Sequence, residues 1–206
     1  MSQLWPDIPF NLAVSGITSC GKSRYTLNLL QTTFKGKFDR IVIFCPTFHE
    51  NKAYEKKFIV KDPDVIVLPP ASVRENLDSL LKTCTETYGG NGDNVLFLID
   101  DCANQKDAKI KSCELTRLAF SGRHLGISVW FITQKYNAVI KDFRDNIRAL
   151  VQFYEKDEDS LKASLSENGV IPKELRAGVI ERLKSSKTAK LVMRLEHPYT
   201  YDVVDN

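Results

Sequence analysis

Residues 15–23 read SGITSCGKS and directly follow the apolar run FNLAV at 10–14. From Gly16 to Ser23 they match the pattern G-x-x-x-x-G-K-[ST]. Glycines at both ends let the backbone approach a bound group closely, and successive N–H groups then face an anion. An ordinary glycine turn that ends a strand is the alternative interpretation. Because a strand pattern precedes the stretch and a helix pattern follows it, we favour a phosphate-binding loop that opens a P-loop NTPase fold.

Each residue type in this loop has an expected task. Lys22 is expected to reach the β- and γ-phosphates as a catalytic point charge, and the Ser23 hydroxyl to bind Mg²⁺. The helix that follows adds the positive end of its dipole. The expected nucleotide-binding residues are Gly16, Ile17, Thr18, Ser19, Cys20, Gly21, Lys22, Ser23 and Arg24, with Cys20 as a small filler.

Apolar runs alternate with helical patterns along the rest of the chain. Continuously apolar runs of this length predict strands of a parallel sheet that is covered on both faces. The fold class is therefore α/β, a three-layer sandwich around a mainly parallel sheet. The predicted strands are 10–15, 40–46, 64–69, 94–101, 127–134, 149–154, 190–196 and 199–204. The predicted helices are 22–34, 72–88 with a capping box at Ser72 and Glu75, 113–126, 157–168 and 172–186.

Polar residues follow two of the apolar runs. VLFLIDD (95–101) ends in Asp100, expected to bind Mg²⁺ with Ser23, and Asp101, expected to deprotonate an attacking water. ISVWFITQ (127–134) ends in Gln134, which could hydrogen-bond that water and a γ-phosphate oxygen. The alternatives are two aspartates that end a strand and a glutamine that satisfies nearby backbone groups.

LAVSGITSCGKS, VLFLIDD and SGRHLGISVWFITQ, in this order, resemble the FtsK–HerA superfamily of DNA-pumping ATPases. Within it, the chain is most similar to genome-packaging ATPases of poxviruses, giant viruses, virophages and Maverick/Polinton elements. The resemblance covers about residues 8–155. It implies a RecA-like (ASCE) core with ATP and Mg²⁺ as cofactors. It also implies a homo-oligomeric ring, pentamer or hexamer, that moves double-stranded DNA into a capsid through a portal vertex protein.

Two features of the resemblance concern particular residues. The superfamily's usual Asp-Glu pair is Asp100-Asp101 here, a variant that also occurs among its viral members. The resemblance also implies an arginine supplied by a neighbouring subunit, with Arg123 in GRHLG as first candidate and Arg117 as second. A surface arginine paired with a local carboxylate is the alternative interpretation for both.

A protein that pumps any genome must contact DNA phosphates without reading bases. Two segments offer lysines and arginines for such contacts. Residues 102–113 carry Lys106, Lys109 and Lys111, and residues 134–144 carry Lys135, Lys141 and Arg144. A merely solvated cluster of charges is the alternative interpretation.

The composition sets limits on the kind of protein. The 206 residues are 43% hydrophobic and 27% charged, with a formal net charge of +3, which permits a nucleic-acid partner without requiring one. We expect a single domain over 1–206, with a core at about 8–155 and a helical and β-hairpin extension at about 156–206. Five cysteines without a C-x-x-C pair indicate a reducing intracellular compartment. The resemblance to viral packaging ATPases implies the cytoplasm or nucleus of an infected cell, and association with the virion. No secretory signal or membrane span is visible in the sequence.

Other P-loop proteins remain as alternatives. A small-molecule kinase would require an arginine-bearing lid, and none stands out. A GTPase would require N-K-x-D after a strand, whereas NQKD at 104–107 has its lysine one place late. A nucleotide-binding scaffold without activity would not need intact Lys22, Ser23 and Asp100. A helicase or a secretion ATPase with the same core is the nearest alternative.

Overall fold

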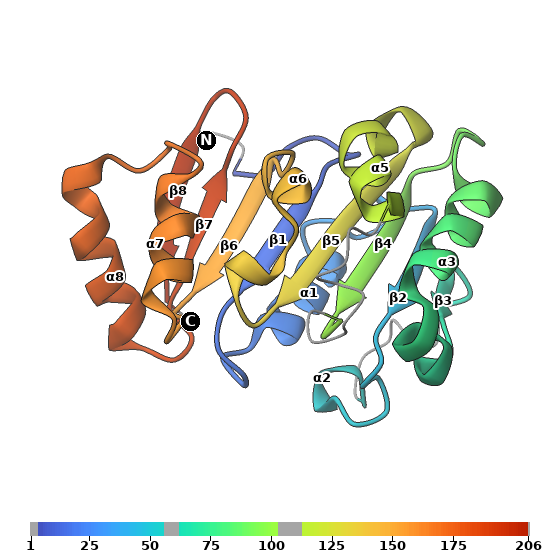
Figure 1. Cartoon of the computed structure of the whole chain (residues 1–206), viewed down its shortest axis with the longest axis horizontal. Coiled ribbons are helices and arrows are strands. Elements are labelled where there is room, and N and C mark those ends of the chain that lie inside the picture. The colour runs from blue at the N-terminus through green and yellow to red at the C-terminus, as the bar shows by residue number, and fades with distance from the viewer. Residues whose placement is uncertain (1–3, 56–61, 103–112, 206) are drawn as a thin grey trace.

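A computed structural model of the protein describes residues 4–55, 62–102 and 113–205. Its centre is one eight-stranded sheet in the order β3-β2-β4-β5-β1-β6-β7-β8, with helices on both faces (Figure 1). The prediction of a three-layer α/β sandwich is therefore confirmed. The two strands expected in the C-terminal extension continue the same sheet beyond β6.

The strands follow the apolar runs of the sequence closely. The strands from β3 to β6 in the sheet order are all parallel, while β7 is antiparallel to β6 and β8 is antiparallel to β7. Every residue of β1, β4, β5, β6 and β7 is buried, as expected for strands covered on both faces. The strands are β1 Leu12–Ser15, β2 Arg40–Phe44, β3 Val65–Val67, β4 Val95–Asp100, β5 Ile127–Thr133, β6 Ala149–Phe153, β7 Lys190–Arg194 and β8 Thr200–Val204.

The helices divide unequally between the two faces of the sheet (Figure 1). One face carries α1 (Lys22–Gln31) and α2 (Lys52–Glu55). The other carries α3 (Pro70–Tyr88), α5 (Cys113–Ser121), α6 (Lys141–Arg144), α7 (Glu158–Ser166) and α8 (Arg176–Ser185). Among the described residues, short 3₁₀ helices complete the connections: η2 (Gly122–Leu125), η3 (Tyr136–Ala138) and η4 (Lys173–Leu175).

Each face has its own apolar core. On the α1 face, Trp130 of β5 is fully buried among the rings of Phe10, Phe34 and Phe38. On the opposite face, leucines and valines from α3, α5, α7 and α8 pack against the alternate side chains of the same strands. Full burial of one large apolar side chain contributes roughly 2–3 kcal/mol to the stability of the fold. The sheet therefore forms a rigid base for the loops at its edges.

Several helix boundaries differ from the prediction. The first helix ends at Gln31 instead of residue 34, and α5 changes to the 3₁₀ helix η2 at Gly122. The capping box at Ser72 is wrong, because α3 already begins at Pro70 and makes no side-chain cap. Proline is favoured there since the first helical N–H has no partner within the helix. The short α2, α6 and η3 were not predicted.

The strand order determines where a ligand can bind. β1 lies between β5 and β6. The connection that leaves the carboxyl end of β1 runs over the α1 face, whereas those that leave β5 and β6 run over the opposite face. Crevices for ligands form at this kind of position, beyond the carboxyl ends of parallel strands. The loop at 16–21 lies there. Within the described residues, no helix has the length and apolarity needed to cross a membrane.

Candidate functional site

The phosphate-binding loop (residues 16–23) connects β1 directly to α1. Gly16 has φ +152°, Ser19 φ +62° and Gly21 φ +100°, so the backbone winds through conformations that side chains with a Cβ rarely adopt. A Cβ at Gly16 would overlap Phe153 of β6, which explains glycine at this position. The Ile17 N–H donates to the Tyr154 carbonyl at 3.0 Å and fixes the loop against the end of β6.

Lys22 is the first residue of α1 and points back into the loop. Its Nζ donates to the carbonyls of Gly16 at 2.7 Å and Ile17 at 2.9 Å, and the residue is only 9% exposed. The ammonium is thereby held inside the curve of the loop, where an anion would also lie. The loop and the lysine thus form one preformed positive site at the start of a helix.

Asp100 ends β4 and is almost completely buried. Its Oδ2 accepts a hydrogen bond from the Tyr54 hydroxyl at 2.9 Å, and the Ser23 hydroxyl bonds to the same carboxyl group. Burial raises the pKa of Asp100 to about 6, although these two hydrogen bonds oppose the rise. Burial therefore disfavours the ionised carboxylate, which a nearby cation would stabilise.

Asp101 follows in the left-handed region, at φ +59°, which is unusual for a residue other than glycine. Its Oδ2 accepts from the Thr47 hydroxyl at 3.0 Å, and its Oδ1 accepts from Gln134 Nε2 at 3.5 Å. The strained backbone thus aims the side chain at the ends of β2 and β5. Such strain concentrates at functional sites.

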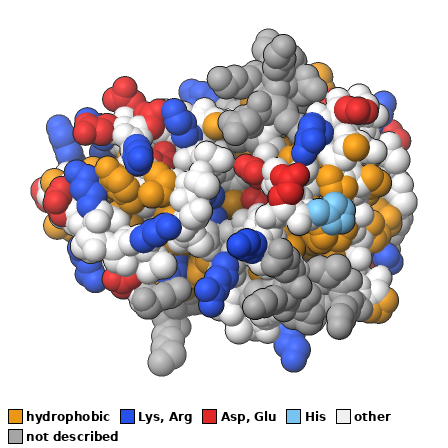
Figure 2. Space-filling model, turned by 90° about the horizontal axis from the view of Figure 1, so that it is seen from below, with side chains coloured by type: hydrophobic (Ala, Val, Ile, Leu, Met, Phe, Trp, Pro, Cys, Tyr) orange, Lys and Arg blue, Asp and Glu red, His pale blue; other side chains and the backbone are white. Residues whose placement is uncertain are grey.

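One cleft of about 960 Å³ joins these groups. Figure 2 views the carboxyl ends of the strands, where acidic and basic side chains lie side by side near the middle of the face. Gly16 and Ile17 do not line the cleft, and they form the base of the loop instead. The residues expected from the sequence that line it are Thr18, Ser19, Cys20, Gly21, Lys22, Ser23, Arg24, Asp100, Asp101 and Gln134.

Ser23 and Asp100 are suited to Mg²⁺. They offer a hydroxyl and a carboxylate oxygen within hydrogen-bonding distance of each other. Mg²⁺ prefers oxygen ligands and takes few from the protein, with waters and phosphates completing its octahedron. The raised pKa of Asp100 indicates that its charge is incompletely compensated by the protein. The donor set therefore fits a magnesium ion bound together with a nucleotide.

Residues 46–55, between β2 and the end of α2, also reach the site, although no motif predicted a role for them. Each of three residues in this segment contacts one of the predicted site residues. Thr47 donates to Asp101, and Tyr54 donates to Asp100. Asn51 Nδ2 donates to Ser23 Oγ at 3.4 Å. Only the position of these residues after a predicted strand could have indicated them, because the carboxyl ends of all strands of a parallel sheet lie at the same edge.

Glu155 is a second residue that the sequence analysis missed. It lies just beyond β6, is 1% exposed, and its Oε1 accepts from Ser15 Oγ, the Tyr136 N–H at 3.0 Å and Gln152 Nε2 at 2.9 Å. Its other oxygen has no hydrogen-bond partner among the described residues. Glu155 therefore fastens the end of β1 and the turn after Gln134 to β6.

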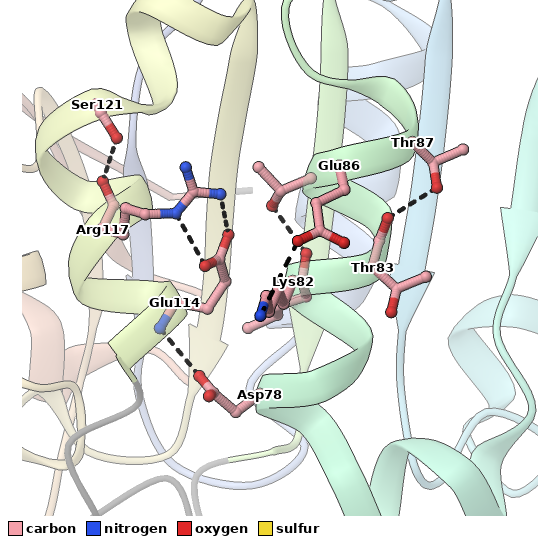
Figure 3. Close-up of polar contacts among 10 residues, drawn as sticks. Asp78, Lys82, Thr83, Glu86, Thr87, Glu114, Arg117 and Ser121 are labelled. Carbon is pink, nitrogen blue, oxygen red and sulfur yellow. Dashed lines mark hydrogen bonds and ion pairs between the residues drawn. The ribbon is translucent and has the colours of Figure 1, made fainter.

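The structure does not bring the candidate arginines to the cleft of their own chain. Arg123 lies in η2, just before β5, and β5 separates it from Gln134 by about 20 Å. It lines a small hollow of about 150 Å³ at the opposite edge of the sheet. Arg117 makes two hydrogen bonds with Glu114 on its own helix, at 2.9 and 2.7 Å, beside α3 (Figure 3). This local pairing is the alternative that the sequence left open.

Of the two segments expected to contact DNA, the structure describes the lysines and the arginine of only one. Lys106, Lys109 and Lys111 lie outside the described residues. Lys135 is exposed and pairs with Asp157 at 2.9 Å, and Lys141 is exposed at the start of α6. The side chain of Arg144 is only 12% exposed.

Arg144 contacts groups of its own chain. It pairs with Glu167 at 3.5 Å and lies over the Tyr136 ring, so its guanidinium is engaged within the fold.

Comparisons with known proteins agree with this geometry. The chain resembles the genome-packaging NTPase B204 of Sulfolobus turreted icosahedral virus 2, with 17% identity and a TM-score of 0.62 over 95% of this chain and 96% of that one. B204 of Sulfolobus turreted icosahedral virus, a DNA-packaging ATPase, gives 16% identity and 0.64 over 95% and 97%. The cytoplasmic domain of the type VII secretion ATPase EccC of Thermomonospora curvata gives 11% and 0.65 over 94% and 25%. These likenesses show a shared fold.

A sequence family identifies the chain more directly. No protein of curated function matches it by sequence. The family described as "Poxvirus A32 protein" matches residues 3–197, which include every element from β1 to β7. This match confirms the resemblance to poxviral proteins expected from the motifs. The chain belongs to the Poxvirus A32 protein family.

Proposed function

We propose that the protein is an ATP-hydrolysing motor that moves double-stranded DNA into a viral capsid. The observation that carries this proposal is the meeting of Lys22, Ser23, Asp100, Asp101 and Gln134 around one cleft. These groups come from two strand ends and one helix start, and together they supply what phosphoryl transfer to water needs. Family membership and the packaging function of the B204 proteins support the choice of task.

Each of these cleft residues has its own role in the proposed ATP hydrolysis. The N–H groups of residues 16–23 and the Lys22 ammonium bind the β- and γ-phosphates and stabilise their charge. Ser23 and Asp100 would hold Mg²⁺, which supplies charge neutralisation between phosphate oxygens when it is bound. Asp101 accepts the proton of the attacking water. Gln134, which already donates to Asp101 at 3.5 Å, orients that water.

The remaining parts of the proposal concern assembly. Arg123 completes the site of a neighbouring subunit in a homo-oligomeric ring, pentamer or hexamer, since its own cleft lies at the other edge of the sheet. DNA is bound without base reading, through lysines such as Lys135 and Lys141. The ring docks on a portal vertex protein of the capsid. This activity belongs to the cytoplasm or nucleus of an infected cell.

The experiment is ATP turnover with Mg²⁺, with and without double-stranded DNA, at several salt concentrations. We expect turnover that DNA stimulates and salt suppresses. Lys22→Ala should reduce turnover by roughly a hundredfold or more, because the phosphates lose a charge held in the loop. Lys184→Ala is the matched control, since Lys184 is exposed on α8 and pairs with Glu181. Unchanged turnover in Lys22→Ala would contradict the site, and absence of DNA stimulation would favour a secretion ATPase or a kinase.

A further inference from the structure

The cleft has a second end, on the other side of β1 from Asp100 and Gln134. Its wall is formed by Tyr25 of α1, Phe153 of β6, Lys190 at the start of β7 and Thr188 just before that strand. Residues 186–189, which connect α8 to β7, belong to the C-terminal extension, for which no motif indicated a role. Lys187 of this connection is near enough to the phosphate-binding loop to oppose the rise in pKa that burial causes at Cys20.

Lys190 is the unusual member of this wall. The sheet pairs it with Phe153, so both side chains point to the α1 face. The residue is 1% exposed, and its Nζ lies 4.9 Å from the centre of the Tyr25 ring and 5.7 Å from that of Phe153. The ammonium is therefore enclosed by two aromatic rings beside the cleft.

An ammonium in such a place is costly to bury. It carries three donors, and among the described residues its hydrogen-bond acceptor is the Thr188 carbonyl at 3.2 Å. Burial lowers the pKa of Lys190, as expected for a cation that has lost water. The two ring contacts offset part of this cost. Donors that remain free at the wall of a cleft are available to an acceptor on a ligand.

The direction of a bound nucleotide follows from the rest of the cleft. Asp101 and Gln134 lie on the β4 and β5 side of β1, where the γ-phosphate would be attacked. The loop at 16–23 holds the middle of the phosphate chain. The nucleoside must then extend towards β6 and β7, which is the position of Tyr25, Phe153 and Lys190.

We propose that this end of the cleft, completed by Lys190 of the C-terminal extension, recognises a purine base. The ring packs against the aromatic wall, and a ring nitrogen or carbonyl oxygen of its edge accepts a hydrogen bond from the Lys190 ammonium. A purine covers more of this wall than a pyrimidine and gains more from apolar burial. The inference rests on the proposed function, because it assumes that phosphates occupy the loop.

The test compares binding of a non-hydrolysable ATP analogue with binding of inorganic tripolyphosphate, which has no base, both with Mg²⁺. Lys190→Met keeps the length of the side chain and removes its donors. We expect its affinity for the ATP analogue to fall about tenfold or more, with tripolyphosphate affinity unchanged. Lys184→Met is the matched control, and thermal unfolding checks that each variant is folded.

Lys22→Ala separates the two proposals, because it should weaken both ligands alike. If it weakens neither, the phosphate site itself is wrong. If Lys190→Met weakens both ligands equally, or neither, the base-recognition proposal is overturned while the phosphate site stands.

Tyr25→Leu gives a second measurement that does not depend on the lysine. The wild type should bind the triphosphates of adenosine and guanosine more tightly than those of cytidine and uridine, and Tyr25→Leu should reduce this preference several-fold. Equal binding of purines and pyrimidines by the wild type would also overturn the proposal.

Discussion

Asp100 is a buried acid whose ionisation the fold opposes. Its carboxyl group is buried, accepts hydrogen bonds from Tyr54 and Ser23, and still has a pKa raised to about 6. The ordinary pKa in the unfolded chain is 3.8, so the native state holds the proton more tightly. Stability therefore falls as pH rises from about 4 to about 6, and the ionised carboxyl costs about 3 kcal/mol at neutral pH.

Asp100→Asn removes this ionisation and keeps the shape of the side chain. We expect the nucleotide-free variant to be more stable than the wild type, by up to about 3 kcal/mol at pH 7.5 and by about 1 kcal/mol less at pH 5, where the native carboxyl is mostly protonated. Urea unfolding at the two pH values measures both differences. Asp202→Asn, an exposed change on β8, is the control. A variant less stable than the wild type at pH 7.5 would show that the protein compensates the charge of Asp100 fully.

The sequence indicated some of the site residues and not others, for a physical reason. Lys22 and Ser23 belong to one local pattern, and Asp100 ends an apolar run, so both signals are readable along the chain. Thr47 and Tyr54 carry no such pattern. They matter because β2 pairs with β4, and only that pairing brings the segment after β2 to the two aspartates.

At the scale of elements, Glu155 joins parts of the chain that are far apart in sequence. It fastens Ser15 at the end of β1 and Tyr136 at the start of η3 to the end of β6. Gln134 lies two residues before Tyr136, so its position relative to the loop at 16–23 depends on this junction. A buried acceptor that serves several donors is costly to remove, because the donors stay buried without a partner.

Glu155→Ala should therefore destabilise the protein by roughly 2–4 kcal/mol, through the donors it leaves at Ser15 and Tyr136. Glu155→Gln keeps an acceptor oxygen and should cost less than about 1 kcal/mol. The free energy of unfolding in urea measures both changes. Equal losses in the two variants would mean that the negative charge matters and the hydrogen bonds do not.

The elements themselves differ in how well a sequence can indicate them. Long apolar runs such as VLFLID predicted buried strands because a strand covered on both faces has no polar side. The four-residue helices α2 and α6 span little more than one turn and show no periodic pattern. At α3, the signal from Ser72 and Glu75 competed with the proline that starts the helix, and the proline determined the boundary.

At the scale of the whole molecule, the cleft and Arg123 lie at opposite edges of the sheet. The cleft occupies the carboxyl ends of the parallel strands, while Arg123 is exposed at the opposite edge, in η2. An arginine so placed cannot act in the cleft of its own chain. It reaches an active site only if a second copy stacks its cleft against this edge, which is the head-to-tail contact that the proposed ring requires.

Mixed assemblies test this arrangement. Arg123→Ala and Asp101→Asn should each reduce ATP turnover by roughly a thousandfold, since one removes the donated cation and the other the base. In an equal mixture, about one site in four combines an intact Asp101 with an intact Arg123 of its neighbour, so about a quarter of wild-type turnover should return if subunits mix at random. Mixing Lys22→Ala with Asp101→Asn is the control, because both groups belong to one cleft and no site is restored. If the two variants are shown to assemble together and turnover does not recover, Arg123 does not act in the site of a neighbouring subunit. Arg117 is held by Glu114 in its own chain, so Arg117→Ala should cause little loss of turnover.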